Sequence, residues 1–176
     1  LSGARSFMNY LIREGQLKSN PGADVSAPQT PRKLPNTLDV DQMAQLLKIE
    51  GDEPETVRDR AMLELFYSSG LRLSELVGLD LGAVDLADGT VRVTGKGSKT
   101  RIVPVGRHAR TEIAAWLKVR VQMARNEEKA LFVGPRGNRI SPRTVQMRVQ
   151  HSALRAGVSQ RVYPHRFRHS FATHLL

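Results

Sequence analysis

Cysteine is absent from the 176 residues, which excludes a disulfide framework, a thiolate metal site and a cysteine nucleophile. This absence fits a reducing cytoplasm. Aromatic residues make up only 5% of the chain, and no apolar run approaches the roughly 20 residues that a membrane span needs. The chain begins at Leu1 without a signal-peptide pattern, and its length suffices for one ordinary domain with a hydrophobic core.

Acidic residues are scarce in the second half of the chain. Residues 91–176 hold 18 Lys and Arg against 3 Asp and Glu, whereas residues 1–90 hold 9 against 14. A basic half with so little acidic relief indicates a polyanionic partner. Nucleic acid is favoured over a membrane surface, because no basic amphipathic helix with aromatic anchors stands out. A merely soluble basic surface is the alternative.

Proline concentrates in one stretch. Four of the nine prolines lie between residues 21 and 35, together with Gly22 and Ser26. This composition predicts an extended linker over residues 19–36. The linker would join a helix within residues 1–18 to the main body, residues 37–176. Because that first helix has no partner helix nearby in sequence, we expect it to be the end of a preceding domain.

Helical patterns dominate the start of the main body. Asp39 with a glutamine three residues later predicts a capped helix. A second helix is predicted from about Pro54 to Gly70, and a short third one over residues 71–76. Within the third, Arg72 and the glutamate three residues on are expected to form an ordinary surface ion pair of little energetic weight.

In the middle of the chain, the spacing of apolar residues changes from that of a helix to that of a strand. Residues 90–94 and 100–105 alternate between apolar and polar side chains around the glycine-rich run GKGSK at 95–99. This pattern predicts a β-hairpin whose tip holds two lysines. Pro104 restricts the second strand to an edge or an end. The tip lacks the spacing of a nucleotide-binding loop, so a phosphate cradle of that kind is not predicted.

The last third is again mainly helical. We predict a helix from about His108 to Arg125, a short strand over 131–133, and a helix from Ser141 to about Arg155. The whole is therefore expected to be mainly α with a small antiparallel hairpin or sheet. Basic residues interleaved along the last of these helices would suit a DNA backbone or groove, although a solvated helix face gives the same pattern.

The stretch YPHRFRHSFATH at 163–174 carries the densest chemistry. Pro164 suits the first turn of a helix, where its missing N–H costs nothing. His165 and Arg168 then project from one face, beside a helix N-terminus that attracts phosphate. The histidine can exchange a proton near neutral pH, and the arginine can bind two oxygens at once. Taken alone, HxxR is more typical of a buried helix start with a hydrogen-bonded His and a solvated Arg.

Three spaced motifs together carry a resemblance that none carries alone. GLRLSEL at 70–76, GKGSK at 95–99 and HRFRH at 165–169 resemble, in order and content, the catalytic domain of the tyrosine recombinases (phage integrase family). The resemblance covers nearly the whole chain and implies that fold. It also implies catalytic roles for Arg72, Lys96, His165 and Arg168, and makes residues 1–18 the last helix of a truncated DNA-clamping domain.

The activity implied is site-specific strand exchange between DNA duplexes. A tyrosine attacks the scissile phosphate, giving a 3′-phosphotyrosyl link and a free 5′-hydroxyl, and a second duplex's 5′-hydroxyl reverses the step. The resemblance implies no cofactor and no metal. It implies a duplex recombination site and a related recombinase within a tetramer as partners, and resolution of chromosome dimers before cell division as the role. DNA contacts are also expected from the basic residues Lys99, Arg101, Arg139, Arg143 and Arg148.

The nucleophile of that reaction is not expected within this chain. Family members carry it some tens of residues beyond the position of Arg168. Tyr10 and Tyr67 fall in helices with apolar faces, and Tyr163 lies on the wrong side of the HxxR motif. We therefore expect a catalytic-domain fragment that cannot cleave DNA by itself. The alternatives are a DNA-binding module that never cuts, and a type IB topoisomerase that relaxes supercoils by similar chemistry.

Overall fold

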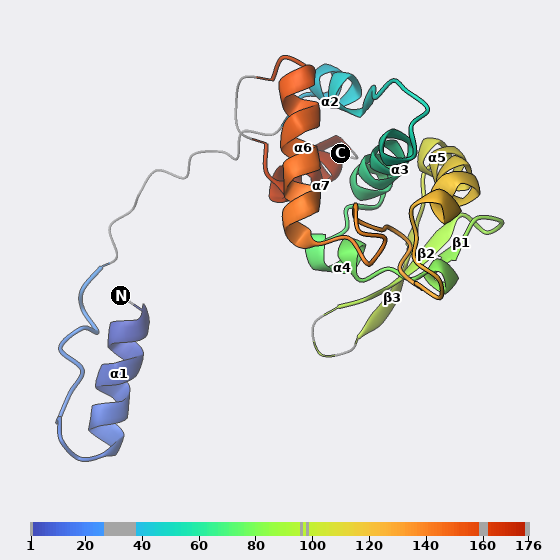
Figure 1. Ribbon diagram of the computed structural model, residues 1–176. Coiled ribbons are helices and arrows are strands. Elements are labelled where there is room, and N and C mark those ends of the chain that lie inside the picture. Colours follow the sequence, from blue (N-terminus) through green and yellow to red (C-terminus); the bar gives the residue numbers. More distant parts are fainter. Residues whose placement is uncertain (1, 27–37, 96, 98, 159–161, 175–176) are drawn as a thin grey trace. The chain divides into compact units, whose positions relative to one another are not determined.

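The computed structural model describes residues 2–26, 38–95, 97, 99–158 and 162–174 (Figure 1). The chain divides into two compact units, Leu1–Leu34 and Pro35–Leu176. The division falls near the end of the predicted linker, but most of that linker, residues 27–36, lies outside the described residues. The assignment of residues 1–18 to a DNA-clamping domain stays a prediction.

The first unit is built around helix α1, Ser2–Arg13. The segment after the helix folds back along it and is held by side chains. Arg5 Nε donates to the Gly22 carbonyl oxygen at 2.8 Å, and Asn20 Nδ2 donates to Asn9 Oδ1 at 2.6 Å. The helix predicted here is confirmed, although it ends a few residues earlier than its apolar pattern suggests.

Helix α3, Pro54–Ser69, is the centre of the second unit. Pro54 begins it, and Gly70, with φ of 53°, ends it in the left-handed conformation that glycine adopts without strain. Helix α2, Val40–Leu47, precedes it and has the predicted capping box, in which Asp39 Oδ1 accepts from the Gln42 backbone N–H at 2.7 Å. Most of α3 is buried, on several faces: Val57, Arg58, Asp59, Ala61, Met62, Leu63, Leu65, Phe66 and Ser69.

A three-stranded antiparallel sheet flanks the helices, in the order β1-β2-β3. After helix α4, Leu73–Val77, and the 3-10 turn η1, Leu81–Ala83, come β1, Val84–Asp85, β2, Thr90–Thr94, and β3, Thr100–Pro104. The predicted hairpin is thus confirmed, and Pro104 lies on an edge strand as its missing donor requires. Strand β1 was not predicted, because two residues carry no readable alternation.

The remaining helices pack around α3. They are α5, Arg107–Val119, continued by the 3-10 turn η3, Arg120–Gln122, then α6, Pro142–Arg155, and α7, Pro164–His174. The strand predicted over 131–133 is wrong. Ala130 and Val133 make only isolated bridges, to Asp80 and Arg139. The segment is apolar because it is buried beneath α5, where Trp116 Nε1 donates to the Leu131 carbonyl oxygen at 2.9 Å.

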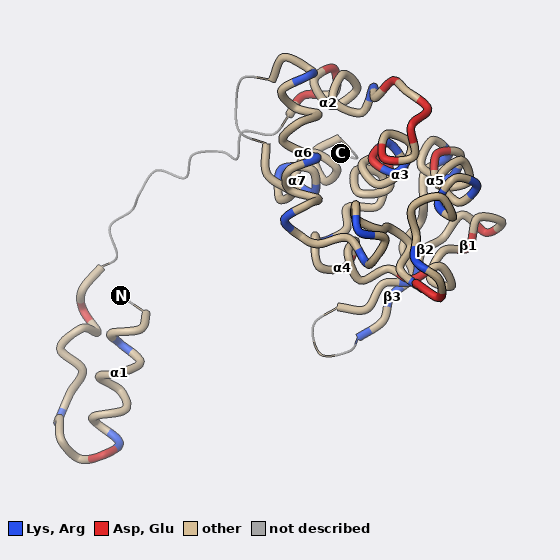
Figure 2. Tube along the Cα trace, viewed as in Figure 1, with Lys and Arg blue, Asp and Glu red and all other residues tan. Residues whose placement is uncertain are grey.

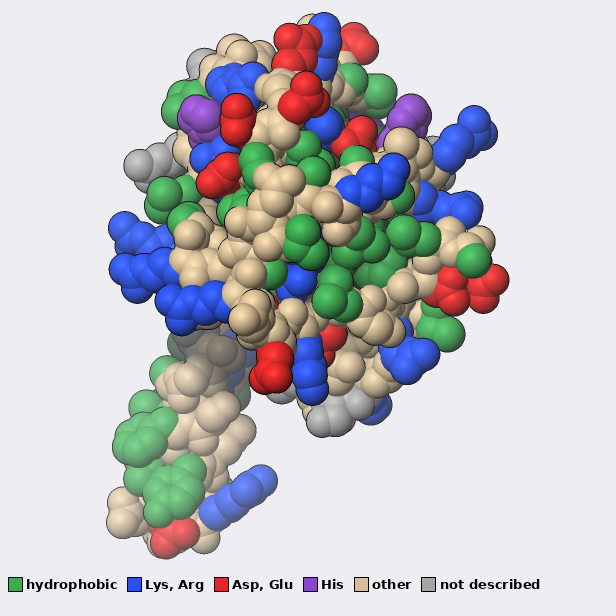
Figure 3. All heavy atoms as spheres, turned by 45° about the vertical axis from the view of Figure 1, so that its right-hand side comes forward, with side chains coloured by type: hydrophobic (Ala, Val, Ile, Leu, Met, Phe, Trp, Pro, Cys, Tyr) green, Lys and Arg blue, Asp and Glu red, His purple; other side chains and the backbone are tan. Residues whose placement is uncertain are grey.

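The placement of charged residues in the structure follows the charge asymmetry of the sequence only in part. Acidic positions gather on α2 and on the turn that leads into α3, whereas basic positions lie on β3, α6 and α7 (Figure 2). The face turned forward in Figure 3, on the side of α5 and the sheet, mixes both signs with apolar side chains. The positive excess is therefore not spread evenly over the molecule. No helix in the described part of the chain is both long and apolar enough to cross a membrane.

Candidate active site

Arg72 lies on the tight turn between α3 and α4, and its position is fixed by Gly70. A Cβ built on Gly70 would lie 2.4 Å from Cδ1 of Phe171 on α7, so only glycine fits. Leu71 is fully buried beside it. Arg72 then caps the N-terminus of α4 and has a side chain that is 58% exposed. The turn that carries Arg72 is thereby held directly against α7, the helix that carries the HxxR motif.

Glu75 is the residue that sequence reasoning missed. The expected ion pair with Arg72 forms, but it is not an ordinary surface pair, because the Glu75 side chain is only 1% exposed and also binds Arg101. Arg101 donates from Nη1 and Nη2 to its two oxygens, at 2.6 and 2.9 Å. Arg72 donates from Nη1 to Oε1 at 3.1 Å and from its backbone N–H to Oε2 at 2.8 Å. The capping-box spacing of Arg72 and Glu75 was the available signal, but the part played by β3 was not readable.

Electrostatics keep Glu75 ionised. Burial by itself raises the pKa of this carboxyl, but the hydrogen bonds from Arg101 and Arg72 outweigh that effect and lower the pKa to about 2. The same interaction raises the pKa of Arg101, chiefly through its hydrogen bonds to Glu75. A permanently charged carboxylate therefore stands beneath Arg72 at any physiological pH.

An open cleft of about 720 Å³ lies over this network, between α4 and the hairpin. Its walls combine cations with small polar side chains: Arg72, Ser74, Glu75, Thr94, Gly95, Lys99, Thr100 and Arg101. The structure thus brings Arg72 together with Lys99 and Arg101 among the predicted site residues. Lys96, the predicted catalytic lysine, lies outside the described residues. Among the described residues no group of three or more His, Asp or Glu is arranged to hold a metal ion.

Helix α7 is held on one side by the core. Phe167 stacks on Phe66 of α3 with ring centroids 5.5 Å apart, and Ser170 Oγ accepts from the Leu38 backbone N–H at 3.2 Å. His165 is exposed, whereas Arg168 is half-buried. Arg168 lies one helical turn before Phe171, the side chain that meets Gly70, so it lies on the side of α7 toward the Arg72 turn.

One nitrogen of Arg168 has no partner. In the described part of the chain, only Arg168 Nη1 and Ser68 Oγ are buried side-chain polar atoms without a hydrogen bond. A buried donor on a charged group is costly to leave unsatisfied, so such atoms call for an explanation. A ligand that carries negative charge would supply the missing acceptor. Arg168 therefore has the environment of an anion-binding group.

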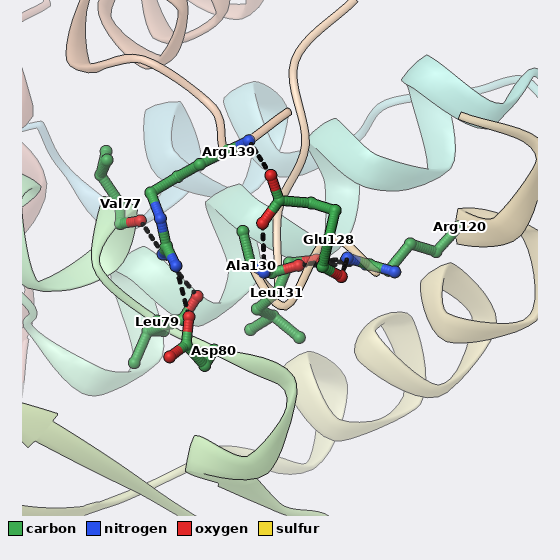
Figure 4. Close-up of polar contacts among 8 residues, drawn as sticks. All are labelled: Val77, Leu79, Asp80, Arg120, Glu128, Ala130, Leu131 and Arg139. Atoms are coloured by element: carbon green, nitrogen blue, oxygen red, sulfur yellow. Dashed lines mark hydrogen bonds and ion pairs between the residues drawn. The ribbon is translucent and has the colours of Figure 1, made fainter. Parts of the chain in front are cut away.

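Arg139 serves the fold rather than an open surface (Figure 4). Its Nη1 donates to the carbonyl oxygens of Val77 and Leu79 at 2.9 and 3.1 Å, and Nη2 pairs with Asp80. Its backbone N–H donates to Glu128 Oε2 at 2.9 Å. These contacts hold both terminal nitrogens of Arg139 against the fold, so the expected DNA contact gains no support at this position.

Glu128 and Arg120 complete the same network (Figure 4). Glu128 Oε1 accepts from the Ala130 backbone N–H at 2.8 Å, and backbone hydrogen bonds of this kind lower the pKa of its carboxyl. Arg120 is buried, which lowers its pKa, and its Nη2 donates to the Ala130 carbonyl oxygen at 2.6 Å. The network pins the buried segment after η3 to the end of α4.

Two predicted DNA contacts lie on α6 and differ in their surroundings. Arg148 Nε pairs with the buried carboxylate of Asp59, which also binds Arg58 through Oδ1 at 2.7 Å. Arg143 is exposed near the start of the helix. Of the two, Arg143 has the accessible side chain, whereas Arg148 joins α6 to α3.

The site gathers cations around one cleft, and sequence comparison identifies the family. The model described as "Phage integrase family" matches residues 36–176. The chain belongs to the phage integrase family. It is similar to tyrosine recombinase XerC of Salmonella typhi, with 52% identity over 176 residues, 100% of this chain and 58% of that protein. XerC of Vibrio cholerae serotype O1 is 49% identical over the same 176 residues and 57% of its own length.

Solved structures agree on the fold. The crystal structure of XerA recombinase matches with a TM-score of 0.73 and 27% identity, over 82% of this chain and 52% of that one. XerH bound to a palindromic difH substrate, a post-cleavage complex, matches with a TM-score of 0.72 and 25% identity, over 85% and 44% of the two chains. The predicted fold class, mainly α with a small antiparallel sheet, is confirmed. The chain spans less than two thirds of the relatives it matches.

Proposed function

We propose that this chain is the catalytic region of a longer, XerC-like tyrosine recombinase that cuts and rejoins DNA at specific sites. The observation that carries the proposal is the buried, unpartnered Nη1 of Arg168, on the helix packed against the Arg72 turn. Two arginines that never deprotonate suit the extra negative charge of a phosphodiester transition state. Residues 37–176 would form this catalytic region, and residues 1–18 the last helix of a DNA-clamping domain.

The chemistry is divided among five side chains, four of which belong to this chain. A tyrosine oxygen, supplied from outside this chain, bonds to the scissile phosphorus as the bond to the 5′-oxygen breaks. Arg72 and Arg168 stabilise the charge on the non-bridging oxygens, and Lys96 donates the proton that the departing 5′-oxygen needs. His165 assists the attacking tyrosine or binds the phosphate. The reverse attack by a 5′-hydroxyl restores the phosphodiester, so neither hydrolysis nor a cofactor enters.

The biological setting is proposed by analogy with the relatives. We propose a cytoplasmic enzyme that resolves chromosome dimers before cell division, with a XerD-like recombinase beside it in a tetrameric synaptic complex. An FtsK-type DNA translocase would be a further partner. The similarity to XerC proteins supports this setting over a type IB topoisomerase or a DNA-binding module that never cuts.

The full-length recombinase, meaning the longer protein proposed above, allows a direct test. Incubated with a nicked suicide duplex, it forms a covalent protein–DNA band on a denaturing gel, and this chain alone forms none. Lys96→Ala slows cleavage by about 10²–10⁴-fold, the usual contribution of a positioned general acid. On a duplex with sulfur at the bridging 5′ position, which leaves without a proton, Lys96→Ala regains most of the rate.

The arginine variants serve as matched controls on the same two substrates. Arg72→Ala and Arg168→Ala stay slow on the sulfur duplex, because their charge acts on the non-bridging oxygens. Absence of any covalent band from the full-length protein would refute the recombinase proposal. A Lys96→Ala variant that stays equally impaired on sulfur would refute only the assignment of the acid, and Lys99 or His165 would be examined next.

A further inference from the structure

Glu75 binds its two arginines unequally. Arg101 engages both carboxylate oxygens in a forked pair, whereas the Arg72 side chain reaches one oxygen through one nitrogen. A guanidinium has five N–H donors, so most of those on Arg72 remain for another acceptor. The Arg72 side chain is also 58% exposed along the cleft, against 1% for Glu75. Glu75 therefore holds Arg72 in place while most of the Arg72 N–H donors stay available to a ligand.

Arg101 keeps the Arg72 side chain from pairing with both oxygens of Glu75. A buried carboxylate needs full compensation, and forked pairing with a single arginine is its preferred form. With Arg101 absent, Arg72 would be the only guanidinium within reach of Glu75 among the contacts described here. Fork-to-fork pairing would then turn Arg72 down toward Glu75 and away from the cleft.

The same contact fastens the hairpin. Arg101 lies on β3 opposite the buried Val93, on the face of the sheet that looks toward α4. Gly95 opens the hairpin tip, its N–H donates to the Lys99 carbonyl oxygen at 2.8 Å, and a Cβ built on it would lie 3.6 Å from Glu75 Oε1. The base of the lysine-bearing tip therefore sits against the carboxylate that Arg101 holds.

We propose that Arg101 is a positioning residue that acts through Glu75, holding Arg72 open to the scissile phosphate and the hairpin beside it, rather than a residue that binds DNA. This inference rests on the proposed function and revises the expectation that Arg101 contacts DNA. Lysine cannot replace it fully, because an ammonium lacks the planar fork that spans both oxygens.

The test compares four variants of the full-length recombinase: Arg101→Gln, Arg101→Lys, Glu75→Gln and the double Glu75→Gln/Arg101→Gln. Arg101→Gln lowers the cleavage rate on the suicide duplex by about 10- to 100-fold, the size of effect seen when a catalytic group is misplaced. Arg101→Lys recovers part of that loss. The double variant cleaves within about twofold of Glu75→Gln alone, because an effect that passes through Glu75 vanishes once Glu75 is neutral.

Duplex binding by each variant supplies the readout that separates positioning from DNA contact. Arg101→Gln keeps the wild-type slope of log Kd against log salt, whereas loss of a phosphate contact lowers that slope by about one. Arg92→Gln is the matched control, since it removes one charge from β2 on the opposite face of the sheet. Thermal unfolding of every variant shows that each is folded under assay conditions.

Two results would overturn the inference while leaving the recombinase proposal intact. One is additive losses in the double variant with an active wild type, which would mean that Arg101 acts independently of Glu75. The other is a reduced salt slope for Arg101→Gln but not for Arg92→Gln, which would make Arg101 a DNA contact. An inactive wild type would instead count against the proposed function itself.

Discussion

Arg168 holds a buried nitrogen that its own fold does not satisfy. In a binding site such an atom raises the free energy of the empty protein and is compensated only when the ligand arrives. Replacing the side chain by one of similar length without donors should therefore favour the folded state. We expect Arg168→Met to raise the free energy of unfolding by about 1 kcal/mol, measured by urea denaturation of this chain.

Arg58 offers the matched control for that experiment. It is equally charged and fully buried, and it donates to the Asp59 carboxylate and to the Val133 carbonyl oxygen, the latter at 3.1 Å. Arg58→Met should lower the free energy of unfolding by about 3–5 kcal/mol, because it breaks a buried pair. A loss of stability in Arg168→Met comparable to that of Arg58→Met would show that Arg168 is a structural residue.

Ionisation of Glu75 should make the free energy of unfolding depend on pH in the acidic range. Its pKa is lowered to about 2 in the folded protein, against 4.5 when the group is unperturbed. The unfolded chain therefore binds a proton first, and the contribution of Glu75, on the order of 3 kcal/mol, is present above pH 4.5 and lost as pH falls toward 2. Urea unfolding at pH 7, 4.5 and 3 should show a shallower decline for Glu75→Gln than for the wild type. Parallel declines would contradict this ion-pair geometry.

At the scale of elements, the junction between α3 and α7 depends on one glycine. Gly70→Ala places a Cβ 2.4 Å from Phe171 and also forces alanine to a φ of 53°. The clash and the strain together should lower the free energy of unfolding by at least about 2 kcal/mol. Gly157→Ala, at φ of 70° with no atom within 4 Å of the added Cβ, carries the strain alone and should cost about 1 kcal/mol. Equal losses would mean that α7 moves aside without cost.

The sequence predicts some of these helices and strands better than others. The ends of α3 and the caps of α2 and α6 were predicted because Pro54, Gly70, Asp39 and Ser141 act through their own backbone neighbourhood. The strand expected over 131–133 failed because a short apolar run looks the same in a strand and in a buried connection.

The residues of the candidate site could be predicted only where they lie close together in the sequence. The placement of His165 and Arg168 one turn apart on α7 follows from helical spacing, and the three motifs together suggested Arg72 and Lys96. The role of Arg101 was not readable, because its partner lies 26 positions earlier in the sequence. Likewise, nothing local distinguishes Arg139, whose terminal nitrogens bind the fold, from Arg143, which is exposed. Sequence patterns report a side chain's type and spacing, whereas its partners come from tertiary packing.

For the whole molecule, the formal net charge of +10 predicts strongly salt-dependent binding to duplex DNA. Each phosphate neutralised by a cation releases counterions, so affinity should fall steeply and linearly on logarithmic axes as salt rises. Fluorescence anisotropy of a labelled duplex with this chain, from low to physiological salt, measures the slope. Arg143→Gln should lower the slope by about one, whereas Arg139→Gln, whose partners are internal, should leave it unchanged. A slope near zero would remove the nucleic-acid interpretation.

The hydrogen bonds between Leu38 and α7 have a consequence for the order in which the chain folds during its synthesis. The backbone of Leu38 binds Ser170 and His174, which follow it by 132 and 136 positions, at 3.2 and 3.1 Å. On a ribosome that adds roughly 5–20 residues per second, the start of this unit waits on the order of ten seconds for its partner. During that time Phe66 lacks the ring of Phe167 that covers it in the finished fold. The contact between the Arg72 turn and α7 therefore forms only after α7 has emerged, and until then the side of α3 that carries Phe66 lacks its cover.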